Sequence, residues 1–431
     1  MKGIKLKNKK YILAISFANY VIAKSGMPKV MLSHQILFNK AETSYISLFS
    51  VKKNIYHDKY TLFCYFGILV DGEFIGVYSI NEIIKMLKSL DINGYDLLGI
   101  HIHHLLYIKL KHIQRLLDHV LNVPIKIFLH DYYYACTRYN LMYNKEYYCG
   151  GKGLNSINCS GCKYYESSIK QEKLIHEIFT THKERITFIS PSDITKDIFL
   201  RFHPEYKNQT IVISHQNLIG HNKDNLELIE KNEKIRIAFL GMPARHKGWD
   251  AWVKLVNYLP KDKYEFYVFN SSKDEYEGMN KVYIQFDGSH LNSMVDALCK
   301  NKIHIAFLWA IWPETYSYTC FESYAANAFI ITNEYSGNIT DVIKKYNNGM
   351  ILSDNYCEVL SHYDSLREMI NSYRLNNQGG PLLLEDNDEI VQMSFDEEDS
   401  YIVDIKETVK MPSMMGKIVD KLYRKRIGGN V

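Results

Sequence analysis

The sequence lacks any long apolar run. Nothing in its 431 residues approaches the about 18 consecutive apolar residues that identify a membrane-spanning helix. A basic stretch, residues 2–10, precedes a strand-length apolar run at residues 11–17, but no small-residue cleavage site typical of a secretory signal follows. We therefore expect a cytoplasmic protein. In that compartment the eight cysteines should be thiols or metal ligands rather than disulfides.

The sequence also has little excess charge of either sign. Its 52 basic and 48 acidic residues leave a formal net charge of +4, and no stripe of basic and aromatic residues accompanies the cysteines. Both observations argue against a nucleic-acid-binding protein. A composition of 46% hydrophobic and 23% charged residues is instead typical of a soluble globular protein.

Two common nucleotide-binding fingerprints are absent as well. No G-x-G-x-x-G follows the first expected strand of either half, which argues against a nicotinamide-dependent dehydrogenase. No loop carries the G-K-[ST] ending of a Walker motif. The length exceeds one typical domain, so we expect two.

Strand-like and helix-like segments alternate along most of the chain. In the first half, strands are expected at residues 11–17, 45–49, 97–103, 125–129 and 186–190, and helices at 29–39, 81–90, 109–121, 170–183 and 194–202. After a polar cluster between residues 220 and 233 the alternation restarts, with strands at 235–240, 264–269, 282–286, 303–309 and 329–332, and helices at 249–258 and 291–299. This predicts an α/β fold of two Rossmann-like, doubly wound domains facing each other across a cleft. The expected division is 1–220, 233–375 and a final segment, 376–431.

The final segment is less regular than the rest. Residues 384–400 are acidic, and residues 414–426 form a basic amphipathic stretch. Charge runs of this kind are usually solvated faces. The alternative for the basic stretch is peripheral contact with an anionic membrane surface.

Two carboxylates stand in the loop that follows the expected strand at 303–309. Glu314 and Glu322 have seven residues between them, and a helix-compatible run leads on into the next apolar strand. Ligands of open parallel sheets bind at the carboxyl ends of strands, so both carboxylates are candidates for one binding site. The structural alternative is a capping box formed by Thr319 and Glu322, with Glu314 an ordinary solvated loop residue.

A basic loop, residues 241–248, directly follows the first expected strand of the second domain. The free amides at the start of the next helix make this position a natural anion site. Arg245 and Lys247 would add formal charge for a diphosphate. The alternative is a solvated basic turn.

Histidines cluster near the ends of two first-domain strands. His101, His103 and His104 end one strand, and His130 ends the next. Three neighbouring histidines can hold a metal ion, but side chains of this kind more often line a binding site or hydrogen-bond within it. His130 is a single titratable group at a strand's carboxyl end, where the interdomain cleft is expected.

Four cysteines form a local cluster with the spacing C-x12-C-x9-C-x2-C. They are Cys136, Cys149, Cys159 and Cys162. The last two form a good zinc half-site, because two intervening residues let both thiolates reach one tetrahedral ion. The first pair has an unusual spacing for a zinc ribbon. A structural zinc, free thiols and a redox pair are therefore all open.

Together these features resemble bacterial glycosyltransferases of the GT-B fold, similar to glycosyltransferase family 4 and its surface-polysaccharide subgroup. The similarity runs through most of residues 11–355. It rests on the E-x7-E motif of Glu314 and Glu322, on Lys247-Gly248, and on His130 followed by the cysteine cluster. The chain departs from the family pattern at Met242, where a basic residue is usual, and at Ser25-Gly26, where the family has a Gly-Gly loop.

The resemblance implies roles for individual residues. His130 would contact the reacting sugar, Glu314 would orient the donor sugar, and Lys247 would neutralise the departing diphosphate. Glu322 would accept hydrogen bonds from the ribose. The donor-binding residues that it implies are Gly26, Arg245, Lys247, Glu314, Thr315, Tyr316, Ser317, Tyr318, Thr319 and Glu322.

The resemblance also implies an activity. A sugar would move from a nucleotide-diphosphate donor to an acceptor hydroxyl with retention of configuration and with no metal required for catalysis. The implied acceptor is a lipid-linked surface polysaccharide of the O-antigen or capsule type, reached by a cytoplasmic protein at the inner face of the membrane. The alternative is a non-catalytic nucleotide-sugar-binding relative that serves as a partner subunit.

Overall fold

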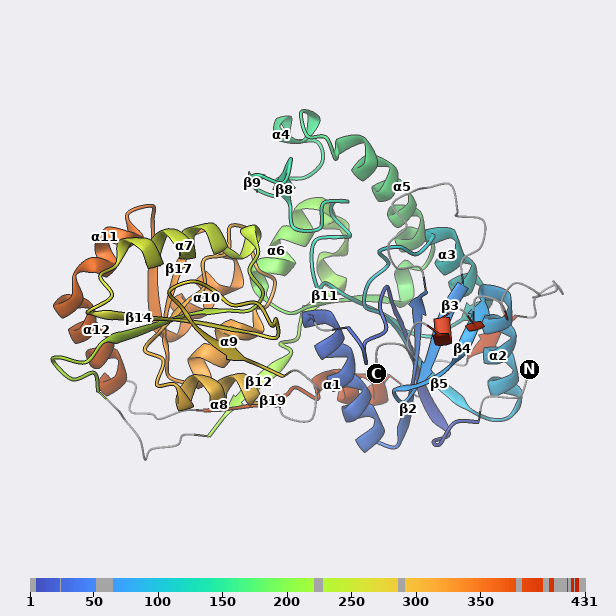
Figure 1. Ribbon diagram of the computed structural model, residues 1–431. Helices are drawn as coiled ribbons and strands as arrows, with labels where there is room; N and C mark the ends of the chain where they lie inside the picture. Colours follow the sequence, from blue (N-terminus) through green and yellow to red (C-terminus); the bar gives the residue numbers. More distant parts are fainter. Residues whose placement is uncertain are drawn as a thin grey trace.

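The computed structural model describes residues 5–23, 25–51, 65–220, 228–285, 291–376, 382–397 and 403–406, together with 417, 420, 421 and 423–425. It has two lobes lying side by side, each built on its own sheet (Figure 1). In the described ranges no helix has both the length and the apolar character needed to cross a membrane.

The sheet of the first lobe has eight strands in the described part of the chain. Their order is β11-β10-β7-β5-β1-β2-β3-β4. The strands are β1 (Lys10–Ser16), β2 (Thr43–Ser50), β3 (Tyr65–Val70), β4 (Glu73–Ser79), β5 (Asp96–Ile102), β7 (Ile125–Phe128), β10 (Ile186–Ser190) and β11 (Thr210–Val212). All neighbours pair in parallel except β2 with β3 and β3 with β4.

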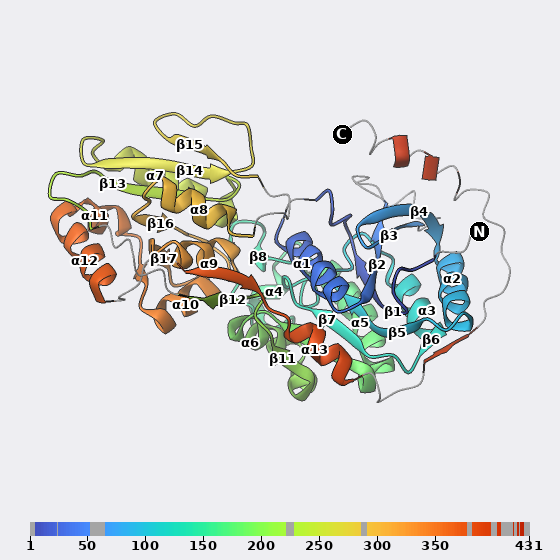
Figure 2. The same cartoon turned by 90° about the horizontal axis from the view of Figure 1, so that it is seen from below.

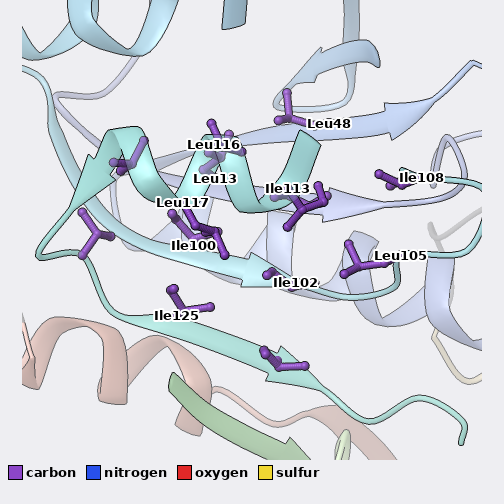
Figure 3. Close-up of a cluster of buried hydrophobic side chains, with 14 of the residues drawn as sticks. Leu13, Leu48, Ile100, Ile102, Leu105, Ile108, Ile113, Leu116, Leu117 and Ile125 are labelled. Atoms are coloured by element: carbon purple, nitrogen blue, oxygen red, sulfur yellow. The ribbon is translucent and has the colours of Figure 1, made fainter. Parts of the chain in front are cut away.

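Side-chain alternation along the strands builds a core on each face of this sheet. Leu13 and Ile15 point to one face, where they pack with α2 (Ile80–Ile92), α3 (Leu110–His119) and α5 (Tyr165–Thr181). Figure 3 shows part of this cluster, with Ile113 and Leu117 of α3 lying over the sheet. Ile12 and Ala14 point to the opposite face, which α1 (Gly26–Lys40) covers.

The sheet of the second lobe is parallel throughout, in the order β15-β14-β13-β16-β17-β18. Its strands are β13 (Ile235–Leu240), β14 (Tyr264–Asn270), β15 (Asn280–Tyr283), β16 (Ile305–Phe307), β17 (Phe329–Asn333) and β18 (Gly349–Leu352). One face packs against α7 (Trp249–Tyr258), α11 (Tyr356–Ser361) and α12 (Tyr363–Asn376). The other packs against α8 (Ser293–Lys300), α9 (Tyr318–Ala325) and α10 (Asn338–Tyr346).

The core beside α9 also includes residues of the first lobe. Tyr132, Leu141 and Ile198 belong to the same buried cluster as Trp312 and Tyr316. Ile198 comes from α6 (Asp193–Phe202), and Leu141 precedes a small ribbon of β8 (Met142–Tyr143) and β9 (Tyr147–Tyr148). The lobes are therefore joined by packed side chains as well as by the chain itself.

The chain returns to the first lobe near its carboxyl end. A short antiparallel ribbon pairs β12 (Gln216–Ile219) with β19 (Leu383–Asp386). Beyond it, α13 (Glu389–Asp396) lies beside α1 (Figure 2), and β20 (Asp404–Ile405) pairs with β6 (Val120–Leu121). The carboxylate of Glu397 lies 2.5 Å from the Nζ atom of Lys126, a fully buried residue of β7.

The predicted fold class is confirmed: two parallel-cored sheets carry helices on their faces. The antiparallel pair β3–β4 was not predicted, although Asp71-Gly72 stands between two strand-like runs. Both turn residues have positive φ, at 50° and 88°, which is typical of a tight hairpin. Most of the predicted polar linker, residues 221–227, and most of the basic stretch, 414–426, lie outside the described residues.

Candidate active site

The candidate site of the second lobe lies where its strand order reverses, between β13 and β16. Lys247 follows β13 in a single 3-10 turn, Arg245–Lys247, and Glu314 lies in the loop after β16. A hydrogen bond from the Ile311 amide to the His246 carbonyl oxygen, 3.0 Å long, joins the two loops. Lys247 and Glu314 thus come from adjoining loops at the same edge of the sheet, which is the ligand position of doubly wound folds.

The Lys247 loop depends on a glycine. Gly248 has φ +82°, and a Cβ atom there would lie 2.1 Å from the carbonyl oxygen of Trp309. Glycine therefore permits both the backbone conformation and the close approach of the two loops. Lys247 is half-buried, with its Nζ atom 3.8 Å from an ideal Cβ position at Gly241. The side chain of Arg245 is 63% exposed and lies 3.8 Å from Asp250.

Glu314 is held on both sides. Its Oε1 atom accepts a hydrogen bond of 3.0 Å from Trp312 Nε1, and its carbonyl oxygen accepts one of 2.9 Å from the Asn338 amide. The backbone also forms an isolated parallel bridge with Gly337. Gly337 has φ +62°, and a Cβ atom there would lie 2.7 Å from the Glu314 nitrogen. The carboxylate is therefore fixed by its own loop rather than being a freely solvated group.

Glu322 faces the other lobe. Its side chain on α9 is 2% exposed, and its Oε1 atom lies 2.8 Å from Nζ of Lys29, which belongs to the first turn of α1. The capping-box alternative does not describe this helix, because α9 begins after Ser317 and no side-chain hydrogen bond caps it. Glu322 forms an ion pair across the lobe interface.

Thr315 connects the two lobes most directly. Its Oγ1 atom donates a hydrogen bond of 2.7 Å to the carbonyl oxygen of His130. Its own carbonyl oxygen accepts hydrogen bonds from Ser192 and Thr195, at 2.6 and 3.2 Å. Nearby, Tyr132 Oη donates to the Pro313 carbonyl oxygen at 3.1 Å. The Glu314 loop is therefore bonded to the segment that carries His130.

The remaining predicted loop residues line the same interface. Tyr316 is buried against His215, with ring centroids 4.6 Å apart. Ser317 has φ +65°, and its Oγ lies 3.2 Å from Oγ1 of Thr319. The ring of Tyr318 lies 4.2 Å from Lys29 Nζ and 3.9 Å from an ideal Cβ position at Gly26. The start of α1 thus approaches the loop that follows β16.

The first lobe contributes uncharged imidazoles to the interface. His130 is half-buried after β7, and its Nε2 atom lies 2.9 Å from Nδ1 of His103. Burial lowers the pKa of His130 well below its usual value, and neighbouring histidines lower it further. Burial likewise lowers the pKa of His215, to about 3. Both rings are therefore neutral at pH 7.

His104 is a separate case. Its Nδ1 atom accepts a hydrogen bond from the Leu106 amide at 3.0 Å, so its proton is on Nε2, which donates to Asp131 at 3.0 Å. This bond anchors the residue that follows His130.

Lys29, His103 and His215 are site residues that were not predicted from the sequence in these roles. Lys29 is three residues beyond Gly26 in the helix that the sequence predicts, which is a usable signal. His215 lies in the connection between the lobes and carries no local pattern. Its position between His130 and Tyr318, with ring centroids 5.7 and 5.9 Å away, depends on how the lobes meet.

The predicted zinc site at Cys136, Cys149, Cys159 and Cys162 is not supported. Within the described ranges, which contain all four cysteines, His34, His101 and His103 are the one group of three potential ligands whose atoms lie within 4.8 Å of one another. No three of the sulfurs therefore gather around a common point. The sulfur of Cys136 contacts Ser168 Oγ at 3.3 Å, and that of Cys159 contacts the Gly153 carbonyl oxygen at 3.5 Å.

The sequence matches no protein-family model and no curated protein. Solved structures do match it. Sucrose-phosphate synthase from Thermosynechococcus elongatus aligns over 97% of this chain and 100% of its own, with a TM-score of 0.52 at 13% identity. The chain has the GT-B fold. A second GT-B structure, S. aureus TarM with fondaparinux, alpha-GlcNAc-glycerol and UDP, aligns over 90% of this chain and 99% of its own, with a TM-score of 0.50 at 9% identity. At these identities the likeness establishes the GT-B fold, and function is argued from the site.

Proposed function

We propose that the chain is a retaining glycosyltransferase that transfers a sugar from a nucleotide-diphosphate donor to an acceptor hydroxyl. One observation carries this proposal. The 2.7 Å hydrogen bond from Thr315 to the His130 carbonyl oxygen joins the loop of Glu314, in one lobe, to the strand end of His130, in the other. Groups suited to a charged nucleotide and groups suited to a neutral sugar therefore meet at one interface.

Lys247 is the residue assigned to the donor's diphosphate. The departing nucleoside diphosphate gains negative charge, and a fixed cation beside it lowers the barrier. Only Gly248 separates Lys247 from α7, a 10-residue helix whose first amides add positive potential. Arg245, largely exposed in the same turn, is the second candidate cation.

The two carboxylates are assigned to the sugars of the donor. Glu322 would accept hydrogen bonds from the ribose hydroxyls, which requires Lys29 to leave its present position 2.8 Å away. Glu314, held by Trp312, would orient the transferred sugar. His130 would contact that sugar from the opposite lobe.

The chemistry is a substitution at the anomeric carbon. The bond between that carbon and the diphosphate oxygen breaks, the acceptor oxygen bonds to the carbon on the same face, and the acceptor's proton passes to the departing diphosphate. No residue of the site is assigned as a covalent nucleophile. Lys247 and the helix amides supply the charge stabilisation that a divalent metal supplies in other sites, so we expect activity to survive treatment with EDTA.

For the acceptor we propose a lipid-linked saccharide of a surface polysaccharide, met at the inner face of the cell membrane. The family resemblance supports this choice. Val21 and Ile22, in the loop between β1 and α1, are 52% and 53% exposed, and α1 begins at the lobe interface. These two exposed apolar side chains, in the loop that leads into α1, would suit an acceptor with a lipid portion.

The test is a panel of nucleotide sugars. Uridine diphosphate sugars come first, because UDP is part of the TarM complex, which has the same fold. Thermal shift measures binding, and release of nucleoside diphosphate measures turnover, each with and without EDTA. Stabilisation by one donor together with its hydrolysis or transfer supports the enzyme. Stabilisation without turnover, with saccharide acceptors present, would favour the non-catalytic binding subunit instead.

A further inference from the structure

Two hydrogen bonds connect Tyr45, His103 and His130 in a row. Tyr45, on β2, places its Oη atom 3.1 Å from His103 Nε2. His103, directly after β5, places Nδ1 2.9 Å from Nε2 of His130. Tyr45 and His103 are fully buried, whereas His130 is half-buried. The row thus leads from the interior of the first lobe to the interface.

The Tyr45 hydroxyl determines which atom is the donor in each of these hydrogen bonds. Its one partner among the described residues is His103 Nε2. If the hydroxyl accepted a proton from that nitrogen, its own proton would be buried without an acceptor, which costs about 1–3 kcal/mol. The hydroxyl is therefore the donor. His103 is neutral, so its proton is on Nδ1 and is donated to His130 Nε2.

The proton of His130 must then lie on Nδ1. Its Nε2 lone pair is occupied by His103, and the ring is neutral. The Nδ1 atom of His130 has no hydrogen-bond partner in the described part of the chain. His130 is half-buried, whereas both ring nitrogens of His101 are fully buried without a partner. The Nδ1–H group of His130 is therefore available as a hydrogen-bond donor at the lobe interface. Its lone-pair nitrogen, Nε2, faces His103.

The same histidines raise the question of a metal ion, because potential ligand atoms of His34, His101 and His103 lie within 4.8 Å of one another. Both nitrogens of His103, however, already take part in hydrogen bonds, to Tyr45 and to His130. A metal would have to break one of these bonds. The hydrogen-bonded row is the better account of this cluster.

We propose that Tyr45 and His103 are positioning residues that hold His130 with its proton on Nδ1, so that His130 donates a hydrogen bond to an oxygen of the transferred sugar and does not act as a base. The inference rests on the proposed function for its catalytic part. It restricts the donors to sugars with an oxygen acceptor, a hydroxyl or a carboxylate, at the position facing His130.

The proton position can be measured without activity. In protein labelled with ¹⁵N-histidine, ring ¹H–¹⁵N correlation spectra distinguish the Nδ1–H and Nε2–H forms, and His130→Gln identifies the signal of His130. The expected form in the wild type is Nδ1–H. In Tyr45→Phe, which keeps the buried ring, we expect a shift toward Nε2–H. Tyr11→Phe is the matched control, because the Tyr11 hydroxyl is also buried but bonds nothing in the described structure.

Kinetics tests the catalytic part. With the donor found in the panel, Tyr45→Phe should lower kcat about 10-fold to 100-fold, the scale of losing an outer-shell partner, with little change in donor KM. His103→Leu should behave in the same way. His103→Gln should recover much of the rate, because an amide can accept from Tyr45 and donate to His130.

Three results would overturn the proposal. These are an Nε2–H signal for wild-type His130, a Tyr45→Phe spectrum identical to that of the wild type, and a shifted spectrum with unchanged kcat. A different result separates the two claims. If the spectra change as expected but no donor or acceptor supports transfer even in the wild type, the proposed function fails and the catalytic role of the row fails with it, while the proton assignment stands.

Discussion

The two lobes share one architecture but bring opposite chemistry to their interface. The second lobe ends its strands in ionic groups, Lys247 and Glu314, on loops fixed by glycines with positive φ. The first ends its strands in neutral imidazoles, among them the buried His103 and the half-buried His130. In the proposed function, the ionic groups serve the charged diphosphate of the donor and the neutral imidazoles serve uncharged hydroxyls. The contrast teaches that a doubly wound sheet fixes where a ligand binds, while the loop side chains fix which ligand it is.

The largest effect on turnover is expected for variants of the ionic residues of the second lobe. Lys247→Ala and Glu314→Ala should each reduce turnover at least about 100-fold, the scale of losing one charge-stabilising contact. Nucleoside diphosphate release with the identified donor measures this, and thermal unfolding checks that the variants stay folded. Lys300→Ala, an exposed lysine in the last turn of α8, is the control. Near-normal turnover in either site variant would remove the charge-based role of the second lobe.

The ion pair between Lys29 and Glu322, which lies across the lobe interface, comes next. Lys29→Met leaves the buried Glu322 carboxylate without its partner, so we expect the free energy of unfolding to fall by about 1–3 kcal/mol. Lys40→Met, at the exposed end of the same helix, should change stability little. A double-mutant cycle with Glu322→Gln measures the coupling. A coupling energy near zero would mean that the two residues do not stabilise each other.

The stability of the first lobe, which contains buried neutral histidines, should fall at acid pH. Burial lowers the pKa of His34 to about 3, from an unfolded value of 6.5. Below pH 6.5 the unfolded chain binds a proton that the folded chain does not, so stability is complete above that pH and is lost as the pH falls toward 3. One such histidine contributes a slope of about 1.4 kcal/mol per pH unit. His34→Met should reduce the slope measured by urea unfolding between pH 6.5 and 5. A slope as steep as that of the wild type would contradict the assignment, and the exposed His176 provides the control, as His176→Gln.

The smallest effect is expected at Ser317, where a non-glycine residue has φ +65° beside the ionic loop. Ser317→Gly should relieve backbone strain and stabilise the protein by up to about 1 kcal/mol, partly offset by the entropy of glycine. Denaturant unfolding measures this. Destabilisation would instead indicate that the contact with Thr319 Oγ1 outweighs the strain.

Local patterns were sufficient for the fold class and for most elements of both sheets. Strand-length apolar runs and amphipathic helices alternate, and an E-x7-E loop after a buried strand stands out without any coordinates. The β3–β4 hairpin was missed because no strand was predicted between residues 50 and 96. The Asp71-Gly72 turn was an available signal.

Contacts between distant residues were beyond local patterns. Glu322 and its partner Lys29 are 293 positions apart. The position of His103 beside His130 depends on β5 and β7 being neighbours, and its bond to Tyr45 depends on β2 lying two strands away across β1. The zinc alternative is not supported for a related reason: cysteine spacing shows which sulfurs are close along the chain, but not where an irregular segment directs them.

The β12–β19 ribbon means that the lobes are connected by two antiparallel crossings rather than by one linker. A paired ribbon resists shear, because sliding one strand along the other would break its ladder of hydrogen bonds. We therefore expect the lobes to move relative to each other by a hinge rotation about this ribbon rather than by sliding. A protease cut in one crossing would leave the other covalently intact, so the nicked protein should still run as a single particle on a sizing column.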